Sequence, residues 1–140
     1  MMGLWIDGTA NWWNTGCMAR NRKPESRSSC PIAMTLDVLG DRWSLVIVRD
    51  MMLGKKRFTE FLASPESITT SVLSDRLAGL EAAGLVERKP YQKRPPRYEY
   101  LLTEEGRALL PVVQEICRWA NKTIPGSWAP PDSFMKKKKL

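Results

Sequence analysis

The sequence contains no histidine, and its cysteines are few. Without histidine, Ser-His-Asp and Cys-His catalysis, histidine metal sites and the commonest general base at neutral pH are excluded. The three cysteines, at positions 17, 30 and 117, have the spacing of neither a zinc cluster nor a disulfide framework. There is also no Gly-rich phosphate loop and no carboxylate cluster. We therefore expect no enzyme, no cofactor and no metal.

Long apolar runs are absent as well. No stretch approaches the roughly 18 residues needed to cross a membrane. The N-terminus lacks the basic region and apolar core of a secretory signal. Unpaired cysteines suit a reducing compartment, so a cytoplasmic protein without a membrane partner is the simplest expectation.

Positive charge is plentiful: 22 Lys and Arg stand against 15 Asp and Glu, which gives a net charge of +7. A basic domain is attracted to polyanions, nucleic acid first and acidic membrane second. Composition alone leaves open a soluble protein that happens to be basic. With 140 residues, 43% of them hydrophobic, the chain can form one small domain with a core.

Residues 68–86 predict one amphipathic helix whose two ends are marked. Thr69 or Thr70 can cap its N-terminus, and Gly84 suits a left-handed C-terminal position. Three leucines spaced i, i+4 and i+7 predict one buried stripe: Leu73, Leu77 and Leu80. The opposite face carries short polar side chains and one arginine. Such a face suits a helix that reads DNA, and it suits a solvent-exposed face equally well.

Three shorter segments precede this helix. Cys30-Pro31 marks a helix start, because Pro is favoured at the first helical position. That helix should end at Gly40, and Asp41 should cap a second one over 42–53, which is apolar nearly all round and therefore central. A short helix over 58–62 and a turn follow. Three helices with a tight turn before the last one indicate a helix-turn-helix.

After the helix the hydrophobic period changes from 3.6 to 2. This predicts strands over 86–91 and 97–102 joined by a loop over 92–96, with Pro90 tolerable only at an edge or bulge. The hairpin is strongly basic, with five cations against Glu87: Arg88, Lys89, Lys93, Arg94 and Arg97. A basic hairpin directly after an amphipathic helix is typical of a wing. A solvated edge hairpin is the alternative.

A last helix should be capped by Thr103 and kinked or split by Pro111. Its apolar residues exceed what one small core needs: Leu109, Val113, Ile116 and Trp119. Part of this stripe should therefore bury against a second subunit, unless it only covers the winged domain. We expect residues 1–29 to be a flexible leader or dimer arm, 30–125 the domain, and 126–140 a disordered Lys-rich tail.

Several motifs occur in unbroken order from about Cys30 to Trp119. They are Cys30-Pro-Ile, Leu39-Gly-Asp-Arg-Trp43-Ser-Leu, Val72-Leu-Ser-Asp-Arg-Leu77, Leu80-Glu-Ala-Ala-Gly-Leu-Val86, Pro95-Pro-Arg-Tyr-Glu-Tyr100 and Leu102-Thr-Glu-Glu-Gly-Arg107. Together they resemble the HxlR-type winged helix-turn-helix regulators, which are relatives of the MarR group. The turn Ser64-Pro-Glu-Ser67 departs from the Pro-Gly turn of the pattern, which puts the angle of the following helix in doubt.

This resemblance implies a fold and a mode of action. The fold is α+β, mainly α: a winged helix-turn-helix with a two-stranded wing and N- and C-terminal dimerisation helices. The function is that of a sequence-specific DNA-binding transcriptional regulator, a homodimeric repressor on a palindromic operator with an oxidant or small-molecule effector. The alternatives are a non-specific nucleic-acid-binding module and a protein-interaction winged helix.

Candidate DNA contacts fall into two groups. The helix over 69–83 should lie in the major groove with these residues toward the bases: Thr69, Thr70, Ser71, Ser74 and Arg76. Arg76 has the alternative of a salt bridge to Glu60 or Asp75. The wing and its surroundings should contact phosphates or the minor groove through Lys55, Lys56, Lys89, Lys93, Arg94 and Arg97.

Cys30 is a candidate redox sensor. As the residue before Pro31, it should place its sulfur at the positive end of a helix dipole, which lowers the pKa of a thiol. The resemblance implies oxidant or electrophile sensing, since several family members use a cysteine at the matching position for it. A small capping residue without a sensing role is the alternative.

Overall fold

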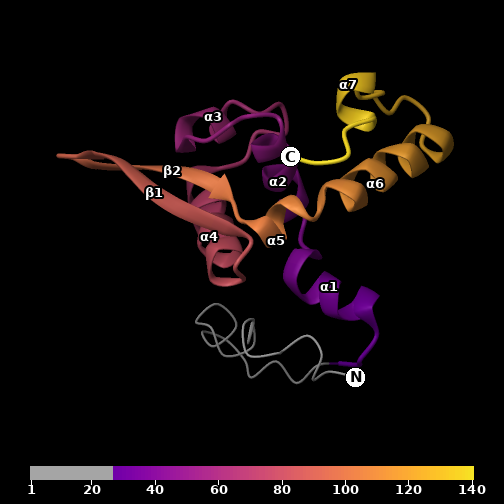
Figure 1. The fold of residues 1–140 in the computed structure, drawn as a ribbon, viewed down its shortest axis with the longest axis horizontal. Coiled ribbons are helices and arrows are strands. Elements are labelled where there is room, and N and C mark those ends of the chain that lie inside the picture. Colours follow the sequence, from indigo (N-terminus) through magenta and orange to yellow (C-terminus); the bar gives the residue numbers. More distant parts are fainter. Residues whose placement is uncertain (1–26) are drawn as a thin grey trace.

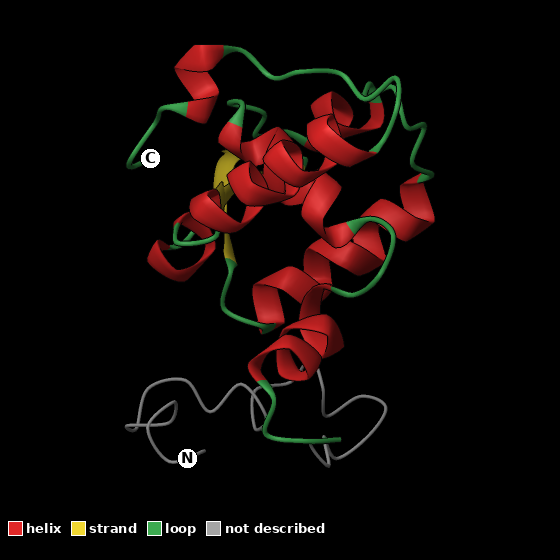
Figure 2. Cartoon of the chain, turned by 90° about the vertical axis from the view of Figure 1, so that its right-hand side faces the viewer, coloured by secondary structure: helices red, strands yellow, loops and turns green. Residues whose placement is uncertain are grey.

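The computed structural model describes residues 27–140, so the predicted leader over 1–29 lies almost entirely outside the described residues. Its elements, in chain order, are α1 (Pro31–Leu39), α2 (Ser44–Met52), α3 (Phe58–Leu62), α4 (Thr70–Ala82), β1 (Val86–Lys93), β2 (Pro96–Leu102), α5 (Glu104–Arg107), α6 (Leu110–Thr123) and α7 (Asp132–Met135). The hairpin projects from one end of the helical body, and α6 and α7 lie at the other end (Figure 1). Helices make up most of that body (Figure 2). Within the described part, no helix is both long and apolar enough to span a bilayer.

Helix α4 forms as its sequence predicts. Of the two candidate caps it is Thr69 that lies at the N-cap, where its Oγ1 accepts from the N–H of Val72 at 3.4 Å. Gly84 follows the helix with φ +78°, a left-handed conformation that only glycine adopts without strain. The three leucines of the stripe are at most 2% exposed. Capping and periodicity, both local signals, therefore fix this helix.

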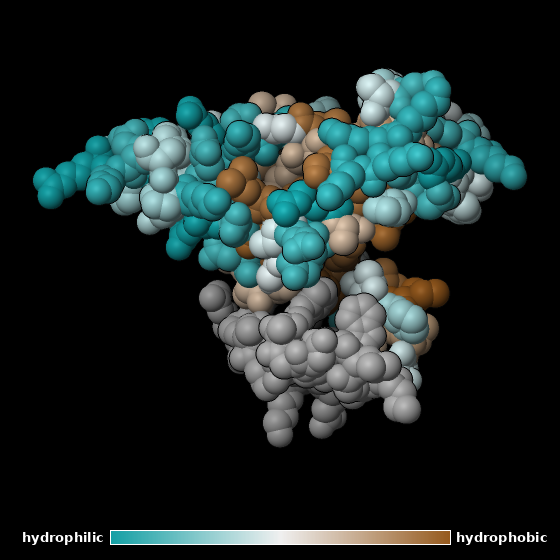
Figure 3. Space-filling model, in the orientation of Figure 1, coloured by the Kyte–Doolittle hydropathy of each residue, from teal (hydrophilic) through white to brown (hydrophobic). Residues whose placement is uncertain are grey.

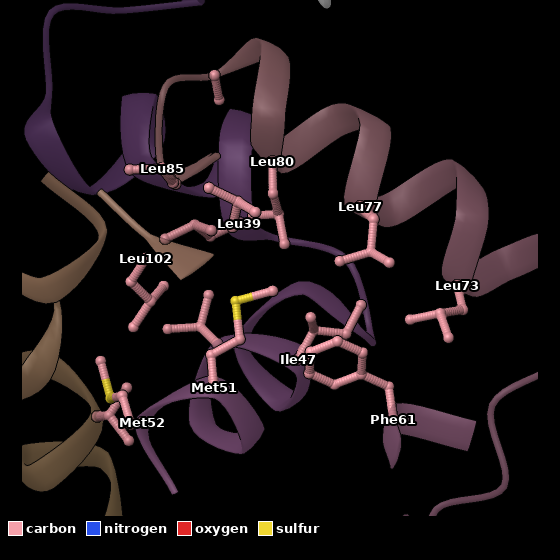
Figure 4. Packing of buried hydrophobic residues seen from close by; sticks show 14 of the residues in the cluster. Leu39, Ile47, Met51, Met52, Phe61, Leu73, Leu77, Leu80, Leu85 and Leu102 are labelled. Atoms are coloured by element: carbon pink, nitrogen blue, oxygen red, sulfur yellow. The ribbon is translucent and has the colours of Figure 1, made fainter. Parts of the chain in front are cut away.

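The core lies between α4 and α2. Figure 4 shows Leu77 and Leu80 of α4 pointing toward the side chains of α2, with Phe61 of α3 at one end and Leu102 of β2 at the other. Burial of each leucine contributes roughly 1.5–3 kcal/mol. One position of α2 differs from the apolar helix expected, because Asp50 is only 3% exposed.

The starts of α1 and α2 follow the predicted signals. Pro31 opens α1 directly after Cys30, and Gly40 ends it. The carboxylate of Asp41 accepts from the backbone N–H groups of Trp43 at 2.8 Å and Ser44 at 3.0 Å. The second helix therefore begins at Ser44, two residues later than predicted.

The hairpin is longer and its turn tighter than the sequence suggests. Both strands extend into the expected loop, which leaves Arg94 and Pro95 at the turn. Pro90 pairs with Tyr98 beside an irregularity in the register, as expected for a proline within a strand. A third segment adds to the sheet, because the N–H of Tyr100 donates to the carbonyl of Lys56 at 2.8 Å and an isolated bridge joins Arg57 to Glu99. The root of the hairpin is thereby tied to the helical body.

The C-terminal part splits, as expected at Pro111, into α5 and α6. The Oγ1 of Thr103 caps α5 by accepting from the N–H of Gly106 at 3.1 Å. The segment after α6, expected to be a disordered tail, instead contains the short helix α7. Phe134 of α7 is buried, and Gln114 of α6 donates through Nε2 to the carbonyls of Phe134 at 2.9 Å and Lys137 at 2.8 Å. A buried aromatic anchor thus holds this segment against α6.

Candidate nucleic-acid interface

The face of α4 opposite the leucine stripe is polar and exposed. Thr69, Thr70, Ser71 and Ser74 all lie on it with exposed side chains. Each hydroxyl can both donate and accept a hydrogen bond, which suits the edges of several bases. No bulky apolar side chain stands between them that would hold the helix away from a groove.

Arg76, predicted to face the bases, is turned toward its own protein. Its Nε lies 3.4 Å from a carboxylate oxygen of Asp41 and its Nη1 lies 3.9 Å from Asp75. Of the two alternative partners considered, Asp75 is therefore close, whereas the carboxylate of Glu60 accepts from the N–H of Arg57 at 3.2 Å. Arg76 joins α4 to the start of α2 through Asp41.

Asp41 consequently has two tasks. Burial raises the pKa of its carboxyl, but hydrogen bonds from Ser44 and Trp43 together with the charge of Arg76 outweigh that effect, and the pKa of Asp41 is lowered. The carboxylate stays ionised, accepts from the two N–H groups at the start of α2 and lies beside the arginine of α4. This ion pair adds to the packing of the α4 leucines on α2.

The hairpin divides its cations into two groups. Nearer the root, the guanidinium of Arg88 lies 4.3 Å from the ring centre of Tyr98. Arg57, which precedes α3, lies with its guanidinium 4.4 Å from the ring centre of Tyr91 of the hairpin. Toward the turn, Lys93, Arg94 and Arg97 are exposed, and none forms an ion pair within residues 27–140. In Figure 3 the projecting hairpin is hydrophilic along its length. The free cations therefore gather where the hairpin reaches farthest from the body.

Of the four lysines predicted to contact DNA, Lys55, Lys56 and Lys89 lie away from the hairpin turn, and only Lys93 lies beside it. Lys55 is the least available, because its Nζ donates to Ser64 Oγ at 2.6 Å and lies 3.3 Å from a carboxylate oxygen of Asp50. Lys89 is exposed and lies 3.4 Å from Glu87. Lys56 is exposed without an ion pair in the described chain. Lys55 is thus engaged within the fold, by contacts that the sequence did not predict.

A charged network around Asp50 holds the turn that precedes α4. The Oδ1 of Asp50 accepts from Arg49 at 2.7 and 3.0 Å, while its Oδ2 accepts from the hydroxyl of Ser64. Arg49 also forms a two-pronged pair with Glu66, at 2.6 and 3.1 Å. This pair lowers the pKa of Glu66. Sequence reasoning missed the network; the adjacent charged residues Arg49 and Asp50 inside a mainly apolar helix were its signal.

The same turn ends in a strained residue. Ser67 has φ +60°, in the left-handed region where glycine is favoured. This is where the departure from the expected Pro-Gly turn has its effect. In the same turn, Ser64 donates a hydrogen bond to Asp50 and Glu66 forms an ion pair with Arg49. Both partners belong to α2, and these interactions offset the strain at Ser67.

Cys30 is fully exposed at the start of α1. The backbone N–H groups of Ala33 and Ile32 point toward the sulfur and lower the pKa of its thiol. Cys117 is half-buried on α6, and Cys17 lies outside the described residues. Between residues 27 and 140 no cluster of His, Cys, Asp or Glu has the makings of a metal site.

Comparison with known proteins agrees with this geometry. The chain is 44% identical over 94 residues to YybR of Bacillus subtilis, an uncharacterised HTH-type transcriptional regulator, covering 67% of this chain and 75% of that protein. The redox regulator HypR in its reduced form shares 42% identity with a TM-score of 0.64, over 69% of this chain and 95% of that one. The reduced form of the transcriptional regulator YodB from B. subtilis shares 34% identity with a TM-score of 0.59, over 72% and 100%.

These likenesses confirm the predicted winged helix-turn-helix fold, a mainly helical chain with a two-stranded antiparallel hairpin. The profile of one family, described as HxlR-like helix-turn-helix, matches residues 38–127, well over half of the chain. The chain therefore belongs to the HxlR-like helix-turn-helix family of transcriptional regulators.

Proposed function

We propose that this protein binds double-stranded DNA as a homodimer and represses transcription from a palindromic operator. The observation that carries the proposal is that a helix with an exposed polar face and a cationic hairpin pack against each other. Helix α4, whose exposed face bears short hydroxyl side chains, packs against β1, and the same hairpin carries the unpaired cations. A groove-sized polar helix and a cationic hairpin on one rigid body can contact adjacent parts of one duplex.

The two features have different tasks. Ser71 and Ser74, with Thr70, lie toward the N-terminal half of α4, where a recognition helix meets base edges. Lys93, Arg94 and Arg97 would bind phosphates or enter the minor groove, which adds affinity without reading sequence. Arg76 contributes by holding α4 through Asp41, and base contact by this arginine is the weaker alternative.

Pairing of two copies rests on apolar side chains that the single chain leaves exposed. On α1, Ile32 is 71% and Leu36 54% exposed; on α6, Ile116 is 47% and Trp119 61% exposed. In Figure 3, apolar residues appear at the surface over α1. Large apolar side chains that are this exposed on one helix are typical of an interaction site. Two copies joined through α1 and α6 would present two α4 helices to one operator.

Redox control through Cys30 is the second part of the proposal. HypR is described as a redox regulator, and YodB is known in a diamide-treated form. A lowered thiol pKa raises the thiolate fraction at Cys30. Two thiols would form one S–S bond by giving two electrons and two protons to an oxidant such as diamide, which becomes its hydrazine. Because α1 is also a proposed dimer helix, this bond would change the spacing of the two α4 helices.

Selection of bound DNA from a random duplex pool tests the function. We expect an inverted repeat to emerge and to compete at least a hundredfold better than random duplex. Ser71→Ala with Ser74→Ala should reduce the preference, whereas Lys122→Gln at the end of α6 should not. Equal binding of all duplexes would favour a non-specific nucleic-acid-binding module, and no binding at low salt would favour a protein-interaction domain.

Two further measurements test dimerisation and redox control separately. Sedimentation equilibrium should give a dimer for the wild-type chain and a monomer for Trp119→Glu. Diamide should release DNA from wild-type protein and leave Cys30→Ser bound, with Cys117→Ser as the control. Release of DNA from Cys30→Ser by diamide would reject Cys30 as the sensor.

A further inference from the structure

A concave site lies at the root of the wing, away from its tip. The cavity has a volume of about 330 Å³, at the lower end of the range of small-molecule sites. It is formed where the end of α2, the lysine segment that follows and the first part of β1 meet the last part of β2. Segments separated by about fifty residues in the chain therefore share one hollow.

The cavity combines apolar walls with a cationic rim. Met51 and Met52 of α2 and Leu101 and Leu102 of β2 supply apolar surface. Among the lining side chains, the cations Lys55, Lys56, Lys89 and Arg107 outnumber the single carboxylate of Glu87, and Leu140, the last residue of the sequence, also lines the cavity. The three lysines of the rim are among the predicted phosphate contacts, and the fold brings them together around this cavity.

The rim cations differ in how far they are already satisfied. Lys55 is bound to Asp50 and Ser64, and it cannot serve a ligand without breaking that network. Lys89 has one partly exposed partner, Glu87. Lys56 has no ion pair in the part of the chain described. Two lysines, one from each side of the cavity, are therefore available for an added negative charge.

We propose that this cavity binds a small amphipathic organic anion, a carboxylate with a short aliphatic or single-ring tail. A bare inorganic anion would gain nothing from the methionine and leucine walls, and a neutral apolar molecule would leave the lysines without a counter-charge. The volume of about 330 Å³ accommodates a tail of up to about seven carbon atoms or a single ring beyond the carboxylate. Charge at the rim and apolar surface below it match this chemistry.

Binding here would act on the wing. The carbonyl of Lys56 accepts from the N–H of Tyr100, so the rim is part of the edge that ties β2 to the helical body. A carboxylate held between Lys56 and Lys89 would also offset one positive charge next to the proposed DNA surface. This consequence rests on the proposed function, whereas binding of the anion does not. We expect the ligand to weaken DNA binding.

The test uses octanoate on the full-length protein without DNA, read by the ¹³C-methyl signals of its methionines. Single Met51→Leu and Met52→Leu variants assign the two cavity signals. Octanoate should shift both signals saturably. Octanamide, which lacks the charge, and acetate, which lacks the tail, should each bind at least tenfold more weakly. Unshifted Met51 and Met52 signals at saturating octanoate would overturn the proposal.

Two double variants test which cations bind the carboxylate of octanoate. Lys56→Gln with Lys89→Gln should weaken octanoate binding at least tenfold, and Lys93→Gln with Arg94→Gln, an equal loss of charge at the wing tip, should change it less than twofold. Equal weakening by both pairs would overturn the site in favour of general electrostatic attraction. In a DNA titration, octanoate should lower the affinity of the wild type but not of the Lys56/Lys89 variant. Absence of any DNA binding would reject the proposed function and leave the methyl titration valid.

Discussion

Arg94 at the turn of the wing offers the sharpest test of the proposed DNA contact. Its side chain is exposed and forms no ion pair within the described residues, and the hydrogen bond from Gln92 at 3.1 Å uses its backbone carbonyl. Arg94→Gln therefore removes a charge without removing a contact of the fold. Each phosphate neutralised contributes about 0.9 to the slope of log K against log salt, so two copies in a dimer should contribute about 1.8.

The assay is fluorescence anisotropy of a labelled operator duplex across a series of salt concentrations. Neutralisation of about six phosphates per dimer gives a slope of about −5.4, which Arg94→Gln should bring to about −3.6. Affinity for random duplex should fall in parallel, because a phosphate contact carries no sequence information. Lys122→Gln removes the same charge from α6 and should leave the slope unchanged. An unaltered slope for Arg94→Gln would remove the wing tip from the mechanism.

Three further predictions concern the turn before α4. Ser67→Gly should raise the free energy of unfolding in urea by about 1 kcal/mol, because φ +60° is strained for serine; a loss of stability would contradict that account. Asp50→Asn should lower it by about 3 kcal/mol, because the carboxylate is 4% exposed and holds two cations, while the exposed Asp75→Asn should change it by less than about 0.5 kcal/mol. Arg49 lowers the pKa of Glu66, so the stability from this pair is present above the unfolded pKa and lost as pH falls through the folded one. Glu66→Gln should therefore flatten the loss of urea stability between about pH 5 and pH 3, and an unchanged acid limb would refute the assignment.

The elements of the DNA-binding unit followed from sequence because their signals are local. A threonine cap, a leucine every three or four residues and a glycine at the end define α4 within one stretch, and the change to alternating residues defines the hairpin. The exposed hydroxyls of Ser71 and Ser74 and the free cation of Arg94 were predicted for the same reason. Which side of a helix or strand is exposed depends on the spacing of residues along the chain, and that spacing can be read from the sequence.

The partners of charged side chains were decided by the tertiary structure. The sequence by itself determined that Arg76 and Lys55 are cations near the recognition helix. Only the packing of α4 on α2 brought Arg76 to Asp41, and only the fold of the turn brought Lys55 to Ser64 and Asp50. The physical reason is that a charge pair depends on separations of a few ångströms between segments far apart in the chain, whereas periodicity specifies which side of an element is buried and not what it meets.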